Sequence, residues 1–157
     1  MYLEENTKAF IDKGLIKKEN IKNEQILEHL KRSNKDIKTS IAIMEIDEEA
    51  AFNYAYLAML RAGRALMFSF GYRPIDGSQH RTVGEFAKIA MGTEAKIIID
   101  MFDAMRRKRN QFTYDPCIPV SKNEAADAIK YAQRFLNYAI PKIIEQKPEI
   151  ENKILGF

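Results

Sequence analysis

The amino-acid sequence predicts an all-α protein, an up-and-down antiparallel helical bundle with a short N-terminal helix. Three observations indicate this fold class. Glycine and proline are scarce, at 7 and 5 of 157 residues, whereas residues that favour helices are abundant. Apolar residues recur at helical spacing along most of the chain, and few segments alternate as strands do. The connections between the periodic segments are short, as in antiparallel bundles.

The first two expected helices cover residues 2–13 and roughly 23–44. Gly14 ends the first of them, which we interpret as an arm on the main body. The second has an apolar stripe made by Ile26, Leu30, Ile37, Ile41 and Met44. Its polar residues are expected to point elsewhere, namely Lys31, Lys35, Asp36 and Lys38. His29 is expected to face solvent, because it stands among charged residues.

The third expected helix, residues 48–71, is apolar nearly all round and should be central. Asp47 is its predicted N-cap. Small residues form one stripe, Ala51, Ala55, Ala58, Ala62 and Ala65, and bulky residues form another, Phe52, Tyr56, Met59, Leu66 and Phe70. Arg61 and Arg64 interrupt the helix: they either form a polar edge, with an acidic partner such as Asp103, or extend a phosphate-binding surface.

The second half of the chain begins with a polar loop, residues 72–81, and a short helix that Thr82 and Glu85 would open as a capping box. The following helix has an apolar face of Ile98, Met101, Phe102, Met105 and Phe112. Ser121 and Glu124 form a second capping box, and Pro141 is expected to kink or end the last long helix. The expected organisation is an arm (1–22), a bundle (23–145) and a C-terminal tail (146–157).

Composition excludes several classes of function. The single Cys117 cannot form an internal disulfide, and no signal peptide or bilayer-spanning apolar run is visible, so a cytoplasmic protein is expected. The sequence contains no phosphate-binding glycine loop. His29, His80 and one cysteine make no recognisable zinc set, so neither a metal nor a cofactor is predicted. The net charge of +3 allows contact with nucleic acid without arguing for it.

The densest charge lies in "MRRKRNQFTYDP", residues 105–116, where Arg106, Arg107, Lys108 and Arg109 are consecutive. Two interpretations are compatible with this cluster. Cations near the C-terminal end of a helix stabilise it through the helix dipole. Alternatively, the cations bind phosphate, and Arg73 and Arg81 of the polar loop would then join them.

Three segments give the chain a resemblance to the HEPN superfamily (higher eukaryotes and prokaryotes nucleotide-binding domain). They are "AYLAMLRAGRALMFSFGYRP", "SQHRTVGEFA" and "RRKRNQFTYDP", and the likeness spans roughly Ile26 to Ala139. The resemblance implies an up-and-down helical bundle that pairs as a homodimer. It also implies an association with RNA or nucleotides. Many such proteins are metal-independent ribonucleases, often the toxin partner of a small nucleotidyltransferase.

The family's ribonuclease motif is altered in this chain. That motif is an arginine followed by a polar residue, with a histidine four to six residues after the arginine. Arg109 and Asn110 match, but Tyr114 occupies the histidine position. Because a tyrosine pKa is about 10, roughly one phenol in a thousand is deprotonated at pH 7, so Tyr114 would be a poor base. It could still donate a proton or contact phosphate.

The candidate catalytic residues are therefore Arg109, Asn110, Tyr114 and, as a substitute histidine, His80. Arg109 and Tyr114 would point about 140° apart on a regular helix, so a shared site needs a loosened helix or a partner subunit. We expect an RNA- or nucleotide-associated homodimer with a degenerate ribonuclease motif, in a toxin–antitoxin-like pair. Two alternatives are an active metal-independent endoribonuclease and a non-catalytic protein-interaction bundle.

Overall fold

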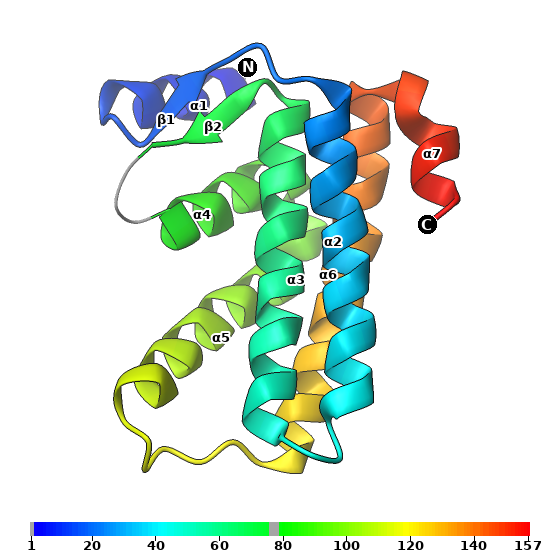
Figure 1. Ribbon diagram of the computed structural model, residues 1–157. Helices are drawn as coiled ribbons and strands as arrows, with labels where there is room; N and C mark the ends of the chain where they lie inside the picture. Colours follow the sequence, from blue (N-terminus) through cyan, green and yellow to red (C-terminus); the bar gives the residue numbers. More distant parts are fainter. Residues whose placement is uncertain (1, 76–78) are drawn as a thin grey trace.

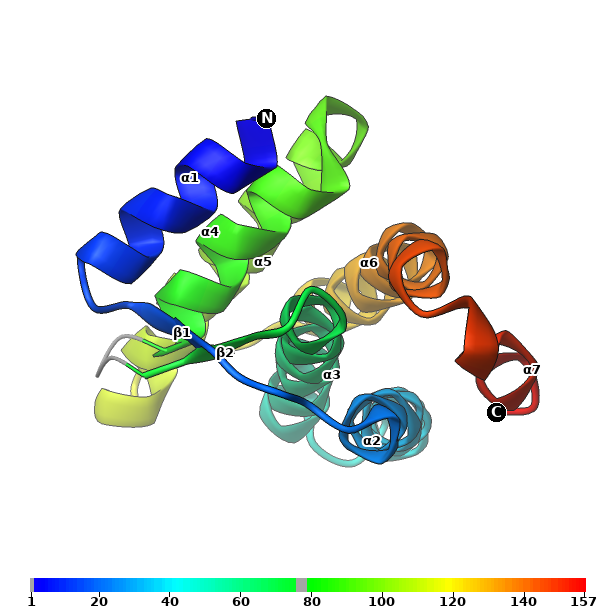
Figure 2. The same cartoon turned by 90° about the horizontal axis from the view of Figure 1, so that it is seen from above.

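Helix α3 (Glu48–Ser69) occupies the centre of the molecule in the computed structural model, which describes residues 2–75 and 79–157. Helix α2 (Asn23–Ile43) and helix α6 (Lys122–Gln146) pack on two of its sides (Figures 1 and 2). Helix α4 (Gln79–Met91) and helix α5 (Lys96–Tyr114) cover a third side. The long helices α2, α3, α5 and α6 run alternately down and up, so the predicted all-α bundle is confirmed.

Small residues let α2 lie close against α3. The five alanines of the predicted small stripe have no exposed surface. The Ser33 hydroxyl donates to the Ala58 carbonyl at 2.7 Å, and the Ser40 hydroxyl donates to the Ala51 carbonyl at 2.6 Å. Side-chain bonds from one helix to the backbone of another require this close approach. The bulky stripe is buried as well, apart from Phe70, which is partly exposed.

Two glycines set the position of α4. A Cβ atom on Gly63 of α3 would lie 2.5 Å from Cγ1 of Val83, a distance that no real contact allows. A Cβ atom on Gly84 would lie 3.2 Å from the Phe102 ring of α5. The missing side chains therefore allow α4 to approach both α3 and α5. A 3-10 helix, η1 (Thr93–Ala95), makes the connection from α4 to α5.

A two-stranded sheet attaches the N-terminal arm, and the sequence did not predict it. Helix α1 (Tyr2–Asp12) leads into β1 (Ile16–Lys18), which pairs antiparallel with β2 (Tyr72–Pro74). Strands of three residues are too short to show an alternating pattern. Of the expected polar loop, residues 76–78 lie outside the described residues. The predicted capping box at Thr82 is wrong, because Thr82 lies inside α4 and is buried.

The C-terminal residues fold back onto the bundle. Pro141 lies inside α6, which continues to Gln146. A 3-10 helix, η2 (Pro148–Ile150), and helix α7 (Glu151–Leu155) follow, and α7 lies beside the bundle in Figure 1. Ile150 and Ile154 are buried, so two apolar residues fix this last segment to the core.

Two expectations for α2 are wrong, and Arg61 has a different acidic partner from the one suggested. Asp36, expected to point outwards, is only 1% exposed and forms an ion pair with Arg61 at 2.6 Å. The expected ion pair of Arg61 with an acidic residue is thus confirmed, although the partner is Asp36 and not Asp103. Ile41, expected in the apolar stripe, is 52% exposed. A buried carboxylate needs a cation, and Arg61 of α3 supplies it from the facing helix.

His29 packs into the molecule and does not simply face solvent. Its ring meets the edge of Phe68, with centroids 5.0 Å apart. Burial lowers the pKa of His29 to about 4, and the positive charges of Arg64, Arg61 and Arg73 add to this. The folded protein therefore keeps His29 neutral at pH values where the unfolded chain would protonate it.

We expect stability to fall as the pH drops from about 6.5 towards 4, since only the unfolded chain then binds a proton at His29. In His29→Gln this contribution is absent, so the free energy of unfolding should depend less steeply on pH in that window. Urea denaturation at a series of pH values measures the slope. The control is Lys31→Gln, an exposed position on the same helix, which should keep the wild-type slope. Equal slopes for His29→Gln and wild type would refute the assignment.

Candidate functional site

One side of α3 presents polar groups to α4 and α5. Asn53, Tyr56 and Arg64 follow one another at helical spacing on that side. Tyr56 has no exposed surface, and its ring stacks on Phe102 of α5 with centroids 5.5 Å apart. The phenol hydroxyl is thus inside the protein and needs a polar partner there.

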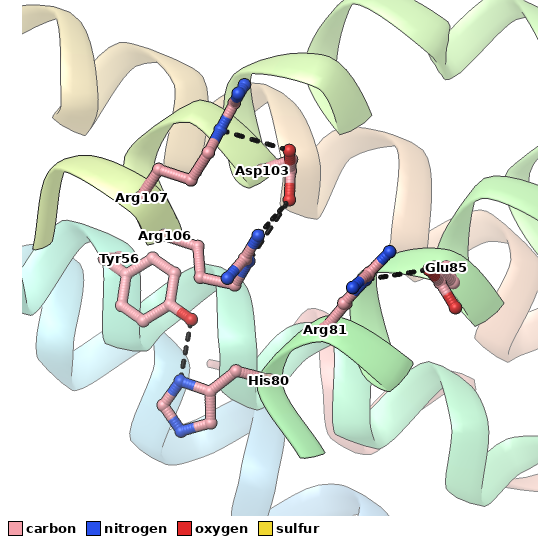
Figure 3. Close-up of polar contacts among 7 residues, drawn as sticks. All are labelled: Tyr56, His80, Arg81, Glu85, Asp103, Arg106 and Arg107. Atoms are coloured by element: carbon pink, nitrogen blue, oxygen red, sulfur yellow. Dashed lines mark hydrogen bonds and ion pairs between the residues drawn. The ribbon is translucent and has the colours of Figure 1, made fainter. Parts of the chain in front are cut away.

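His80, from the first turn of α4, is that partner. The Tyr56 hydroxyl lies 2.8 Å from Nδ1 of His80 (Figure 3). The two rings also contact each other, with centroids 5.7 Å apart. His80 is half-buried, so α4 holds this imidazole at the inner edge of the site.

Arg109 reaches the same tyrosine from α5. Its guanidinium lies over the Tyr56 ring, 5.5 Å from the centroid. Its Nε donates to Oδ1 of Asn53 at 2.8 Å. Two of the predicted catalytic residues, Arg109 and His80, therefore contact one buried tyrosine within a single chain. We call Tyr56, His80, Arg64, Arg106 and Arg109 the Tyr56–His80 site.

Asn110 and Tyr114 lie outside this site. Helix α5 stays regular to Tyr114, so Arg109 and Tyr114 point in different directions. Tyr114 is 86% exposed, and Asn110 is exposed as well. Within one chain the structure does not bring the motif arginine and the residue at the histidine position together.

The four consecutive cations point in different directions because successive residues on a helix are about 100° apart. Arg106 and Arg107 bond to Asp103 at 2.9 and 3.4 Å (Figure 3), whereas Lys108 pairs with Glu124 of α6 at 3.3 Å. The last turn of α5 contains no basic residue. A helix dipole acts mainly within the last turn, so stabilisation of the helix end does not account for the cluster.

A cleft of about 390 Å³ lies between α4 and α5, next to this site. Its basic lining residues are His80, Arg81, Lys88, Arg106 and Arg107. Acidic residues also line it, and Arg81 is paired with Glu85 at 3.2 Å (Figure 3). Arg73 belongs elsewhere: it pairs with Glu19 and lies over the Phe68 ring, in a different cavity with His29.

The HEPN domain family model matches residues 26–144. The chain belongs to the HEPN family. The match covers α2 to α6 almost completely, so the bundle and the Tyr56–His80 site lie inside the HEPN domain. No curated protein matches the chain. Membership indicates, in general terms, a function associated with nucleotides or RNA.

Positive charge in this HEPN domain is only partly neutralised. Arg64 is half-buried, and its bond goes to the amide oxygen of Gln79 at 3.3 Å. Arg109 likewise bonds to the amide oxygen of Asn53. Neither arginine forms an ion pair with a carboxylate within residues 2–75 and 79–157. Burial lowers the pKa of Arg64, and the nearby Arg61 adds to this.

The titratable groups of the site respond to burial and to these cations. Burial lowers the pKa of His80, and the charges of Arg109, Arg64 and Arg106 lower it further. Burial also raises the pKa of Tyr56 to about 12. At neutral pH the site therefore contains a neutral imidazole, a neutral phenol and excess positive charge. An anion would be stabilised in such a place.

The sequence did not single out Tyr56 or Asn53 as site residues, and it offered Arg64 only through the alternative that this residue extends a phosphate-binding surface. Tyr56 matched the bulky apolar stripe and was assigned to the core. A signal was present, however: Asn53 and Arg64 are polar residues on the same side of an otherwise apolar helix as Tyr56.

Within the described residues, no helix is long and apolar enough to cross a membrane. The same residues contain no group of three or more His, Cys, Asp or Glu side chains placed to hold a metal ion.

Proposed function

We propose that this HEPN protein binds phosphate groups of RNA or of a nucleotide at the Tyr56–His80 site, as a homodimer whose ribonuclease motif is degenerate. One observation carries the proposal: Arg64 and Arg109 are held on amide oxygens, and among residues 2–75 and 79–157 no carboxylate pairs with either of them. An arginine guanidinium has five N–H donors and binds phosphate oxygens through several of them. The Asn53 contact uses the Nε donor of Arg109, which leaves its terminal nitrogens for a ligand.

Degeneracy of the motif follows from Tyr114. A phenol is a much poorer general base at neutral pH than an imidazole. Tyr114 also lies on the exposed side of α5, whereas Arg109 is turned inwards onto Tyr56. The motif arginine is thus free to bind a phosphate while lacking the acid/base partner that cleavage needs.

A second candidate function is metal-independent ribonuclease activity that uses His80. The specific observation in its favour is that His80 and Arg109 contact the same tyrosine. An imidazole and a guanidinium this close could act on one phosphodiester, with the arginine stabilising the charge that develops on phosphorus. Direct measurement of cleavage separates this candidate from simple binding.

For the homodimer we propose a face formed by α5 and α6. Along α6, Asp127, Tyr131, Arg134 and Tyr138 follow at helical spacing. Ile97 of α5 is 70% exposed and lines one cavity with Arg134 and Tyr138. The stripe is self-complementary, because the acidic Asp127 lies at one end and the basic Arg134 lies two turns further along α6. A two-fold axis would place Asp127 of one copy near Arg134 of the other.

The protein partner we propose is a small nucleotidyltransferase, in a toxin–antitoxin-like pair. Support for it comes from the likeness of the chain to HEPN toxins. A nucleotidyltransferase gene next to the gene for this chain, and co-purification of the two proteins, would be the expected observations. The third expectation from the sequence, a purely protein-binding bundle, would hold if no RNA or nucleotide binds.

Replacing Arg109 by alanine should weaken binding of a fluorescently labelled single-stranded RNA by about tenfold, as expected for loss of charged hydrogen bonds. The slope of log affinity against log salt should become shallower by about 0.7, because one phosphate fewer is neutralised. Fluorescence anisotropy at several salt concentrations measures both. Lys38→Ala, an exposed cation on α2, is the control and should change neither. An Arg109→Ala protein with wild-type affinity and slope would exclude the site.

We expect the natural protein to leave RNA uncut without metal, because Tyr114 is a poor base and is remote from Arg109. EDTA-treated protein is incubated with labelled RNA, and the products are examined for 2′,3′-cyclic phosphate ends. Robust cleavage that disappears in His80→Ala would establish the second candidate function instead.

Light scattering at micromolar concentration should give about twice the chain mass of 18.1 kDa. Ile97→Glu places a charge in the proposed interface and should shift the protein towards monomer. Ile46→Glu is the matched control, since Ile46 is 82% exposed at the turn after α2 and should leave the dimer intact. A monomeric wild-type protein would contradict the dimer, and a dimeric Ile97→Glu variant would contradict this face.

A further inference from the structure

The hydrogen bond between Tyr56 and His80 has a direction that the surroundings determine. The Tyr56 hydroxyl is completely buried, and its polar contact within the described part of the chain is Nδ1 of His80. A buried hydroxyl proton needs an acceptor. If Nδ1 carried a proton and donated it to the Tyr56 oxygen, the hydroxyl proton of Tyr56 would have no acceptor among the described residues. The hydroxyl therefore donates, and Nδ1 accepts.

From this geometry we propose that Tyr56 is a positioning residue, which holds the His80 proton on Nε2 and makes His80 a hydrogen-bond donor to the bound phosphate. This inference rests on the proposed function for its ligand and on the Tyr56 contact for its chemistry. Figure 3 shows the second ring nitrogen of His80 on the side of the imidazole turned away from the Tyr56 hydroxyl. A ligand reaching that nitrogen meets an N–H group.

The charges around His80 support a neutral imidazole with this tautomer. Arg64 acts on it from α3, and Arg106 and Arg109 act from α5. On α4 itself, Arg81 and Glu85 form an ion pair and neutralise each other. On α5, the carboxylate of Asp103 already pairs with Arg106. Protonation of Nδ1 would also leave the Tyr56 hydroxyl without an acceptor among residues 2–75 and 79–157. At neutral pH, His80 is thus an uncharged hydrogen-bond donor that lies among the guanidinium donors of Arg64, Arg106 and Arg109.

A site made of donors selects a ligand that only accepts. Phosphate oxygens fit this requirement, whereas an amine or another cation does not. The same tautomer bears on catalysis, because neither ring nitrogen can take the proton of a ribose hydroxyl: Nδ1 is occupied by Tyr56, and Nε2 already has its proton. His80 therefore does not replace the missing motif histidine as a general base.

The tautomer can be measured without any ligand. Nitrogen-15 NMR of the imidazole rings distinguishes a protonated ring nitrogen from an unprotonated one, and the chain has only 2 histidines. His29→Gln assigns the signals by removing one of them. We expect the His80 proton on Nε2 in the wild-type protein, and a changed Nδ1 signal in Tyr56→Phe, which keeps the ring and loses the donor. A proton on Nδ1 in the wild type would overturn the inference.

Two amide substitutions then test the role in binding. The Gln side chain in His80→Gln can place its N–H near the position of Nε2, whereas the shorter Asn side chain in His80→Asn reaches only the position of Nδ1. In the RNA anisotropy assay, His80→Gln should keep affinity within about threefold of wild type, and His80→Asn should weaken it about tenfold. The opposite order would refute a donor role for Nε2.

The two measurements separate this inference from the proposed function. If the wild-type protein binds RNA but its His80 proton is on Nδ1, the tautomer assignment fails while the RNA-binding function stands. If the proton is on Nε2 but neither RNA nor adenosine 5′-monophosphate binds, the proposed function fails and with it the phosphate ligand of His80. Circular dichroism of each variant confirms that it is folded.

Discussion

Because most of α3 is buried, polar side chains on its inner faces need partners on the helices that pack against them, since an unpaired polar group inside a protein is costly. Asp36 of α2 meets Arg61, and Arg109 of α5 meets Asn53. From α4, His80 meets Tyr56. These contacts have direction, unlike the apolar packing around them. They therefore determine how the surrounding helices are rotated and placed along α3, and through this they shape the site.

The same requirement separates the elements of the HEPN ribonuclease motif. Arg109 is turned inwards because Asn53 and the face of Tyr56 hold its guanidinium. With Arg109 fixed there, a regular helix carries Tyr114 to the outside of α5. The motif is contiguous in the sequence but lies on two sides of one helix. Any chemistry that needed both residues at one phosphate would have to draw one of them from a second chain.

The electrostatics of the site favour a ligand of one charge sign. Arg64 and Arg109 contribute positive charge and, in the described part of the chain, have no carboxylate partner; they help to keep His80 neutral. A bound phosphate would relieve the repulsion among these groups and accept their hydrogen bonds. Tyr56 contributes indirectly, by donating to His80 and supporting Arg109 with its ring. A tyrosine that periodicity assigns to the core is thus also the residue around which the site is organised.

Sequence periodicity by itself determined the long helices α2, α3, α5 and α6, most of their buried faces and the central place of α3, because repeated apolar spacing over many residues outweighs local exceptions. The local pairing of Ser121 with Glu124 predicted the capping box of α6. It missed β1 and β2, since strands of three residues show no period, and it misplaced Asp36 and His29, since burial of a polar residue depends on its partner. Arg109 was identified as a candidate from the resemblance to the HEPN motif, and His80 as a substitute for the histidine that this motif lacks here. Only the tertiary structure decided that they meet at Tyr56, and that Tyr114 does not join them. The physical reason is that a polar side chain is placed by the group that satisfies its hydrogen bonds, and for Tyr56, Asn53 and Asp36 that group belongs to another helix, distant in the sequence.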